Sequence, residues 1–248
     1  MNCNYKIKKL DELLTDAPNP LMEADSPWQL RAILSEECVS YVAWNTASKE
    51  AVLIDPKDTD EAAYQDIAQT LKGYRWVAVV DTHTHADHIS CAAQMAGALS
   101  APLVMHHAAP SQRVDLRVAK STALNTQASA IKLLPTPGHT PDSLTIIWGP
   151  FIFGGDTILY GDTGRDDLPG GDARAHYESV QRLLAVATTE MILLPGHDNK
   201  GGRASTWQTQ LKLNASLTQP KEQFIAEASS FSTAAPRLLK ESLKENFK

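Results

Sequence analysis

The sequence predicts a mixed α/β fold. Short apolar runs, each long enough for one strand, alternate along the chain with segments whose apolar residues recur at helical spacing. The first three predicted strands follow one another closely, which is typical of hairpins. With 248 residues, of which 43% are hydrophobic and 21% charged, the chain is long enough to bury a large core.

Residues 1–27 are expected to form an N-terminal extension, and residues 28–248 a single domain with a helical C-terminus. Within the extension, residues 6–14 carry Ile and Leu at helical spacing and predict a short helix, which prolines then interrupt. Because we find neither a sequence repeat nor a linker after residue 28, the remainder is predicted to be one unit.

The predicted elements alternate along this unit. Strands are expected at residues 29–34, 38–44, 51–54, 76–80, 102–105, 130–134, 143–148, 151–153 and 191–194. Helices are expected at residues 60–71, from the end of the stretch 81–88 to residue 99, at 173–187, at 203–217 and from 221 to the end, with Pro236 as a break.

Charge and cysteine content narrow the class of protein. The formal net charge is -6 without a basic cluster, which argues against a nucleic-acid partner. No apolar run approaches the roughly 20 residues of a membrane helix, and the N-terminus lacks the apolar core of a signal peptide. Cys3, Cys38 and Cys91 show no pairing pattern, which favours a reducing cytoplasm. The N-terminal extension and the C-terminal helices are candidates either for the contact of a homodimer or for a cover over the mouth of the site.

The stretch from Asp81 to His88 is the strongest functional signal. It lies between the strand at 76–80 and the following helix, and the edge of an α/β sheet is where ligands bind. Histidine and aspartate are common donors to a transition metal, and this stretch contains four of them: His83, His85, Asp87 and His88. The alternative is a polar loop whose histidines are merely solvated.

Three other predicted strands end in the same residue types. His139 and His197 each follow a strand in a Pro-Gly-His sequence, and Asp156 follows two glycines. Rigid Pro and Gly loops suit ligand positions, although a lone aspartate after a strand is usually a cap or turn residue. Together these residue types predict a centre with one or two metals. His106 and His107 are expected to be ordinary loop or packed histidines.

The His-x-His-x-Asp-His motif followed by a separate His, Asp and His resembles the metallo-β-lactamase superfamily. The resemblance implies an αββα sandwich: two mixed sheets face to face, helices on the outer faces and the site at one edge. It assigns seven residues to two metals: the first to His83, His85 and His139, the second to Asp87, His88 and His197, and the bridge to Asp156. Dinuclear hydrolases such as glyoxalase II use this full set.

A narrower resemblance is to the persulfide dioxygenases and covers residues 28–218. It is carried by segments 82–89, 137–141, 155–157, 164–167, 195–198 and 203–214. It implies one Fe(II), held by His83, His139 and Asp156, and oxidation of glutathione persulfide with O2 to sulfite and glutathione. Ala86 also points to this family, because glyoxalase II proteins more often have a bulkier residue there.

This resemblance implies roles for the other polar residues as well. Two histidines and one carboxylate leave three positions open on Fe(II), where O2 and a persulfide sulfur can bind side by side. The other four motif residues would orient the ligands and hydrogen-bond bound water or oxygen. Arg165 would pair with the anionic substrate, and the alternative is a structural ion pair with Asp166 or Asp167.

Four positions depart from the pattern of the persulfide dioxygenases. They are Cys91, Asp142, Asp166 and Asn199. The family has a tyrosine near the substrate where this chain has Asn199, so we include related low-molecular-weight persulfides among the expected substrates. Cys91 is expected to be a small packed residue rather than a redox centre.

Two other functions remain open. The first is a dinuclear zinc or iron hydrolase of a thioester or lactone, in which a metal-bridging hydroxide attacks the carbonyl and Asp87 acts as the catalytic residue that positions it. The second is a binding or sensor protein that kept the ligands but lost turnover.

Overall fold

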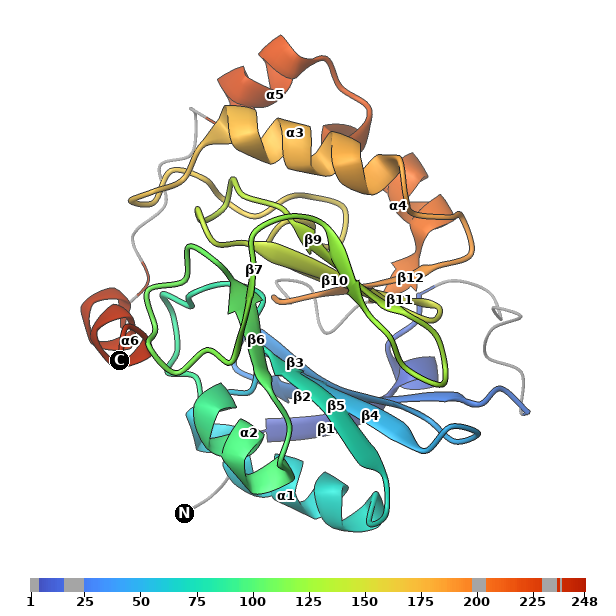
Figure 1. Cartoon of the computed structure of the whole chain (residues 1–248). Coiled ribbons are helices and arrows are strands. Elements are labelled where there is room, and N and C mark those ends of the chain that lie inside the picture. Colours follow the sequence, from blue (N-terminus) through green and yellow to red (C-terminus); the bar gives the residue numbers. More distant parts are fainter. Residues whose placement is uncertain (1–4, 16–24, 198–203, 229–235, 237) are drawn as a thin grey trace.

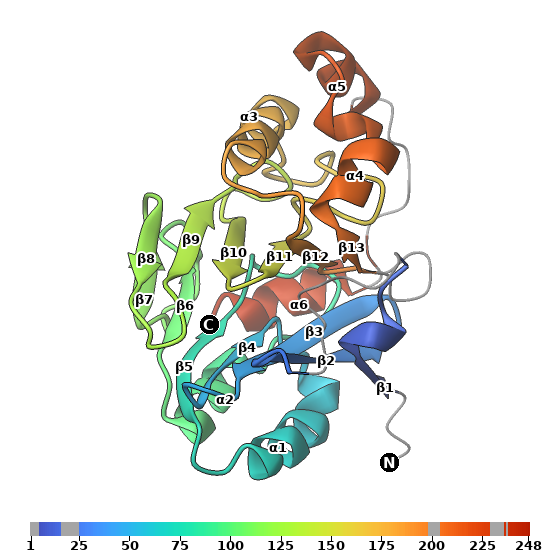
Figure 2. The same ribbon diagram turned by 90° about the vertical axis from the view of Figure 1, so that its right-hand side faces the viewer.

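The computed structural model describes residues 5–15, 25–197, 204–228, 236 and 238–248. In these ranges two β-sheets face each other, and helices cover the outer face of each (Figures 1 and 2). Both sheets mix parallel and antiparallel strands. The predicted sandwich of two mixed sheets with outer helices is therefore confirmed. No helix in these ranges is both long and apolar enough to cross a membrane.

The first sheet contains seven strands in sequence order. They are β1 (Tyr5–Lys9), β2 (Trp28–Ser35), β3 (Cys38–Asn45), β4 (Glu50–Ile54), β5 (Arg75–Val80), β6 (Leu103–His106) and β7 (Leu116–Val118). The first four pair antiparallel, and the strands from β4 to β7 run parallel. Parallel neighbours need long crossovers. Helix α1 (Glu61–Thr70) connects β4 to β5, and α2 (Ala92–Leu99) connects β5 to β6.

The second sheet has the order β13-β12-β11-β10-β9-β8. Its strands are β8 (Thr122–Leu124), β9 (Ile131–Pro135), β10 (Leu144–Trp148), β11 (Phe151–Gly155), β12 (Ile192–Pro195) and β13 (Ser205–Thr206). Only β11 and β12 pair in parallel among these strands, and α3 (Ala173–Leu184) connects them. The C-terminal helices are α4 (Trp207–Leu213), α5 (Lys221–Ala228) and α6 (Leu239–Asn246), and 3-10 turns occupy Leu10–Glu12, Asp58–Asp60 and Ala215–Leu217.

Alternation along β4 shows how the layers are packed. Val52 and Ile54 belong to the apolar core between the two sheets, whereas Ala51 and Leu53 pack beneath α1 and α2. Successive side chains of a strand point to opposite faces, so a sheet that is covered on both faces gives a continuous apolar run. A third cluster, which includes Trp207, packs α3, α4 and α5 on the outer face of the second sheet.

The helix predicted at residues 6–14 is wrong. Tyr5–Lys9 is strand β1, which pairs antiparallel with β2 at the edge of the sheet. Only the 3-10 turn that follows keeps the helical spacing, and it buries Leu10 and Leu13 between the sheets. An isolated helix of nine residues is marginal in water, whereas the free edge of β2 offers hydrogen-bond partners to the whole segment.

The C-terminal predictions are correct only in part. The helix predicted at residues 203–217 is instead strand β13, helix α4 and a 3-10 turn, because the Thr206 side chain caps α4 by accepting a hydrogen bond from the Thr209 amide. Pro236, the predicted break, lies outside any helix, and α6 begins after it. Strands β7 and β8 were not predicted, since each is three residues long and alternates too briefly to be recognised.

Glu50 joins the two sheets far from their functional edge. Its carboxylate is 1% exposed, pairs with Arg75 and accepts hydrogen bonds from the amides of Gln127 (3.1 Å) and Ala128 (2.9 Å). Burial opposes ionisation, but these hydrogen bonds outweigh it and lower the pKa of Glu50 to about 2.

We expect Glu50→Ala to reduce the free energy of unfolding by about 2 kcal/mol, because two partly buried amides lose a charged acceptor. Arg75→Ala is the comparison, and it should cost about 1 kcal/mol since the arginine is largely exposed. Urea unfolding measures both. The folded pKa lies below the ordinary glutamate value of 4.5, so the contribution of Glu50 should be complete above pH 4.5 and vanish as pH falls toward 2. Equal losses for the two variants would contradict this role.

Candidate metal centre

The predicted ligands meet at one edge of the sandwich. The loop of residues 81–91 leads from the end of β5 to the start of α2. The loop that carries His139 joins β9 to β10, while Asp156 and His197 follow β11 and β12 directly. The sequence predicted metal ligands at the ends of four strands, and these strand ends lie side by side in the structure.

Gly155 allows β11 to approach the loop closely. Its φ is +51°, and a Cβ atom there would lie 2.5 Å from Oγ1 of Thr82. A side chain at this position would be both strained and in collision, so glycine is required. The close approach places Asp156, the next residue, against the loop that contains His83.

His83, His139 and Asp156 form one compact group, which we call the triad. Oδ2 of Asp156 lies 4.0 Å from Nε2 of His83 and 3.5 Å from Nε2 of His139. All three side chains are largely buried and line the same pocket. Burial opposes ionisation of Asp156, but the charge and hydrogen bond of His197 outweigh it and hold the pKa of Asp156 well below its ordinary value.

Hydrogen bonds fix which nitrogen of each triad histidine carries the proton. Nδ1 of His139 lies 2.5 Å from the carbonyl oxygen of Arg165, which can only accept, so Nδ1 is protonated. Oγ1 of Thr82 donates to Asp55 and so accepts from Nδ1 of His83, at 3.0 Å. Burial lowers the pKa of His83 well below its ordinary value and keeps the ring neutral. In a neutral ring, each Nε2 atom then presents a lone pair toward Asp156.

Asp87 is the centre of a second group, which we call the Asp87 cluster. Its Oδ2 lies 2.9 Å from Sγ of Cys38 and 3.1 Å from both Nδ1 of His88 and Nε2 of His197. Nδ1 of His197 also lies 2.7 Å from Oδ1 of Asp156. Burial would lower the pKa of His197, but Asp156 and Asp87 raise it well above its ordinary value. His197 thus holds a proton between two carboxylates.

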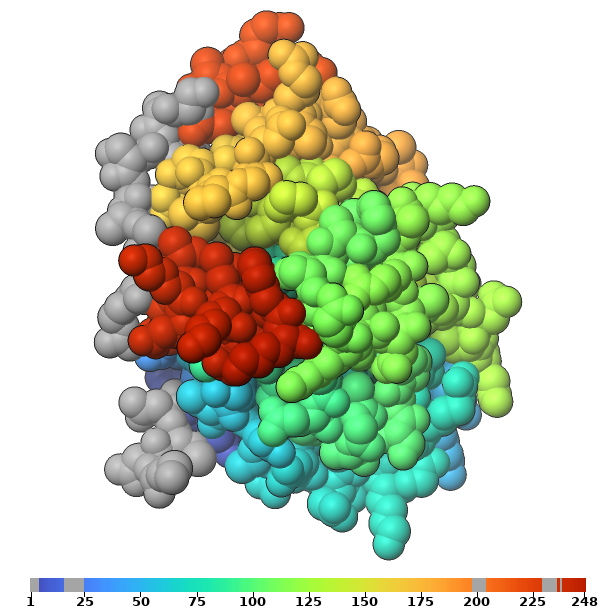
Figure 3. Space-filling view, turned by 60° about the vertical axis from the view of Figure 1, so that its left-hand side comes forward, coloured from blue at the N-terminus to red at the C-terminus, as the bar shows by residue number. Residues whose placement is uncertain are grey.

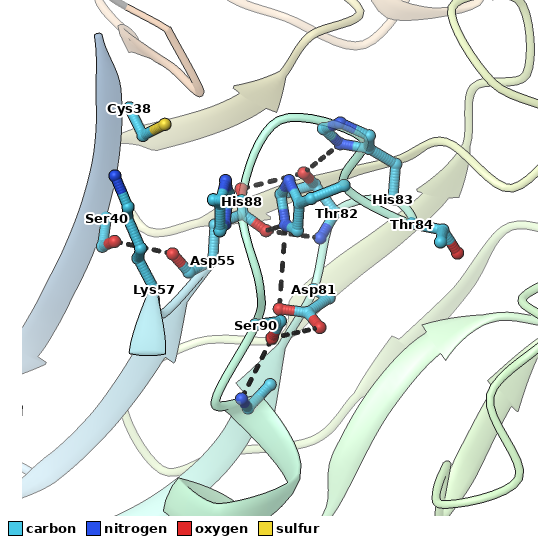
Figure 4. A network of polar contacts seen from close by, with 12 residues as sticks. Cys38, Ser40, Asp55, Lys57, Asp81, Thr82, His83, Thr84, His88 and Ser90 are labelled. Carbon is cyan, nitrogen blue, oxygen red and sulfur yellow. Dashed lines mark hydrogen bonds and ion pairs between the residues drawn. The ribbon is translucent and has the colours of Figure 1, made fainter. Parts of the chain in front are cut away.

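His85 lies in a third group, with Asp55 and Asp81. Its Nε2 is 3.2 Å from Oδ1 of Asp55 and 3.8 Å from Oδ1 of Asp81. Figure 4 shows Thr82 between His83 on one side and Asp81 on the other. Burial raises the pKa of Asp81 to about 6. The ring of His85 thus lies beside that of His83, with 4.3 Å between the ring centroids, but its Nε2 faces Asp55 and Asp81 instead of Asp156.

A cavity of about 400 Å³ opens over the triad, and Arg165 lines it. Of the two sequence interpretations of Arg165, the ion pair is present: Nε lies 2.6 Å from Oδ1 of Asp167, and Nη2 lies 2.7 Å from Oδ2. The alternative partner, Asp166, lies near His176 instead, with 3.4 Å between Oδ2 and Nδ1. The pair with Asp167 leaves Arg165 at the wall of the cavity.

The remaining sequence candidates lie elsewhere. His106 is buried at the end of β6, where its Nδ1 accepts a hydrogen bond from the amide of Ala108, and His107 stacks beside it. Cys91 is 1% exposed and packs beneath α2, as expected of a small packed residue. Asn199 falls outside the described residues.

Three residues of the site were not predicted. Cys38 begins β3 and contacts Asp87, and Asp55 follows β4 and holds Thr82. Asn246, at the end of α6, contacts the loop from outside. None of them lies near the motif in sequence, and only the position of Asp55 after an apolar strand resembled that of the predicted ligands.

Comparison with known proteins agrees with this geometry. The profile of the Metallo-beta-lactamase superfamily matches residues 36–123. The chain is 31% identical over 190 residues to "Persulfide dioxygenase ETHE1, mitochondrial" of Homo sapiens, covering 75% of this chain and 74% of that protein. The crystal structure of ETHE1 from Myxococcus xanthus superposes with a TM-score of 0.81 at 27% identity and covers 88% of this chain and 97% of that one.

A hydrolase is also similar. The chain is 32% identical over 160 residues to "Hydroxyacylglutathione hydrolase" of Anaeromyxobacter dehalogenans, covering 64% of this chain and 61% of that protein. An αββα sandwich with clustered histidines and aspartates at one edge defines the class of the protein. The chain belongs to the metallo-β-lactamase superfamily.

Proposed function

We propose that this protein is an iron-dependent persulfide dioxygenase. Its substrate is glutathione persulfide or a related low-molecular-weight persulfide, which O2 oxidises to sulfite. The similarity to persulfide dioxygenases over three quarters of the chain supports the reaction class. The unpaired Cys38 and Cys91 accord with the reducing cytoplasm in which we place the protein.

One observation carries the proposal of a single iron. Nε2 of His83, Nε2 of His139 and Oδ2 of Asp156 converge as acceptors, and the hydrogen bonds at both Nδ1 atoms leave no proton between them. Acceptors that face one another in a buried site repel unless a cation lies between them. Two imidazoles and one carboxylate are the facial set that suits Fe(II). The residues therefore fit this metal.

The Asp87 cluster differs from the triad in its hydrogen bonding. The thiol of Cys38 donates to Oδ2 of Asp87, and His197 lies within hydrogen-bond distance of both Asp87 and Asp156. Each of these contacts of the Asp87 cluster therefore has a proton between its two atoms, whereas the contacts within the triad have none. We infer that His197 and Asp87 orient Asp156 and hold a proton near the reacting atoms, and that Asp87 is a catalytic residue of the dioxygenase.

The protein supplies binding and orientation, while Fe(II), when bound, supplies the reduction of O2 and the oxidation of sulfur. The carbonyl of Arg165 holds the ring of His139 in place, and Thr82 does the same for His83. The guanidinium of Arg165 lies at the cavity wall, held by Asp167, and we assign to it the contact with the anionic persulfide. The cavity of about 400 Å³ accommodates a small thiol compound.

Metal content and O2 uptake test the proposal together. Protein purified without oxygen is expected to contain iron in a ratio of about one per chain and to consume O2 when glutathione persulfide is added. Two metals per chain without O2 uptake would overturn it.

The second candidate function is a dinuclear zinc or iron hydrolase of a thioester or lactone. It is favoured by the similarity to a hydroxyacylglutathione hydrolase and by the position of Asp87, His88 and His197 beside the triad. In that enzyme Asp87 would position a metal-bridging hydroxide. Thioester and lactone substrates would then be screened.

Arg165→Ala is expected to raise KM for the persulfide about tenfold and to leave iron content unchanged, since one charge-assisted contact with the substrate is lost. Arg174→Ala is the control, because this substitution also removes one positive charge, but at an exposed position of α3. Steady-state O2 uptake at varied persulfide concentration measures KM. A KM that matches the control would mean that Arg165 does not contact the substrate.

A further inference from the structure

The C-terminal helix α6 contacts the backbone of the loop that carries the metal motif. Nδ2 of Asn246 donates to the carbonyl oxygens of His85 and His88, both at 2.9 Å, and its Oδ1 accepts from the amide of Ser90, also at 2.9 Å. The two N–H groups and the carbonyl of the side chain are all used. Within the described residues, no other hydrogen bond reaches these three backbone groups.

The same loop is held by the first sheet on its other side. The amide of Asp58, after β4, donates to the carbonyl of Ile89 at 3.0 Å. Oγ of Ser90 donates to Oδ2 of Asp81 at 2.8 Å, and Figure 4 shows this pair. The loop therefore lies between two supports: residues next to β4 and β5 on one side, and Asn246 on the other.

Helix α6 is seated on the loop rather than merely near it. Ser242, one turn before Asn246, is 0% exposed, so both lie on the packed face of the helix. In Figure 3, α6 (red) packs against residues coloured green. A polar cavity of about 40 Å³ lies between the two surfaces and is lined by Asp81 and His85 as well as by Asn246.

We propose that Asn246 is a positioning residue for the metal centre, through which the docking of α6 raises metal affinity. The three hydrogen bonds fix the backbone from residue 85 to residue 90. This segment carries Asp87 and His88 and continues from His83. A loop that is already ordered loses less conformational entropy when it binds a metal. The inference rests on the metal binding of the proposed function and extends the site to a helix outside the two sheets.

Competition with a chelator for Co²⁺ tests the inference without using O2 or persulfide. The affinity of Asn246→Leu should be lower by about 10- to 100-fold, the range for residues that support metal ligands. Leucine keeps the approximate shape of asparagine and removes the hydrogen bonds. Lys244→Ala, on the exposed face of α6, is the control and should bind as the parent does. Affinities of Asn246→Leu and the control within twofold of each other would overturn the proposal.

Thermal unfolding of the metal-free variants separates positioning from a purely structural role. A purely structural residue would lower the melting temperature and leave the Co²⁺ affinity of the folded protein unchanged, which would also contradict the proposal. A chain that binds Co²⁺ as expected but consumes no O2 would contradict only the proposed function. A parent chain that binds no Co²⁺ would overturn both.

The parent protein provides a second test, which needs no variant to fold. If docking of α6 raises metal affinity, then metal binding must stabilise the docked helix by the same factor. Hydrogen exchange in residues 239–248 should therefore slow by about 10- to 100-fold when Co²⁺ is added. Exchange that is unchanged in α6, while residues 81–91 become protected, would show that the helix and the metal are independent.

Discussion

His83→Ala and His139→Ala are each expected to abolish iron binding. Each change removes one of the two imidazole nitrogens that face Asp156, and the remaining pair of ligands cannot retain Fe(II). Oxygen uptake should disappear with the metal. Iron per chain after anaerobic purification is the primary measurement, with circular dichroism to confirm that the fold is intact.

His197→Ala is the matched comparison, because it removes a histidine from the same edge without removing a triad nitrogen. It should leave the iron bound and lower the rate of O2 uptake only in part, since His197 contacts Asp156 and Asp87 by hydrogen bonds. A metal content that falls by half in His197→Ala would identify a dinuclear centre. Retention of iron in His139→Ala would contradict the triad.

The strand ends alone predicted the edge of the site, whereas the sandwich and the grouping of His83, His139 and Asp156 were implied only by the resemblance to known families. Strand ends are recognisable because an apolar run stops at a polar residue, and this signal placed His83, His139 and Asp156 at the same edge. His85 faces Asp55 instead of Asp156, and Asp55, which follows a different strand, also accepts a hydrogen bond from Thr82. No local pattern encodes such a contact.

The elements that were missed share a physical cause. Strand β1 forms because the edge of β2 offers partners, although its own residues carry helical spacing. Asn246 holds the metal-motif loop because its side-chain amide points at the loop backbone. The residues that these hydrogen bonds join are more than 150 positions apart in the sequence. The periodicity of apolar residues shows which face of a helix or strand is apolar, but it does not show which other element that face packs against.

Asp55→Ala is expected to reduce the free energy of unfolding of the metal-free protein by about 4 kcal/mol, a large fraction of the roughly 5–15 kcal/mol typical of a domain. Asp55 is 3% exposed, and it accepts hydrogen bonds from the amide (2.6 Å) and the hydroxyl (2.8 Å) of Thr82. It also faces His85 at 3.2 Å. Its removal leaves these buried groups without their acceptor, which is the costly way to break a buried pair.

Urea unfolding with two comparison variants separates the causes. Asp58→Ala removes the same charge at an exposed position nearby and should change stability by less than about 0.5 kcal/mol. Asp55 has a φ of +50°, which Asn tolerates better than Ala. Asp55→Asn should therefore lose less than Asp55→Ala, because it avoids the backbone strain and keeps one acceptor for Thr82.

The pH dependence of stability provides an independent check of the same carboxylate. Burial would raise the pKa of Asp55, but the charge and hydrogen bond of His85 outweigh it and lower the pKa below the ordinary aspartate value of 3.8. A carboxylate whose folded pKa is lowered stabilises the protein above its unfolded pKa and ceases to do so as pH falls through the folded one. The difference in stability between the parent and Asp55→Ala should thus be constant between about pH 5 and 6.5 and shrink below pH 3.8. It should also shrink above pH 6.5, because Asp55 raises the pKa of His85 against the effect of burial, and the pair is lost when His85 gives up its proton. A difference that stays constant to pH 2 would show that Asp55 acts through shape and not through its charge.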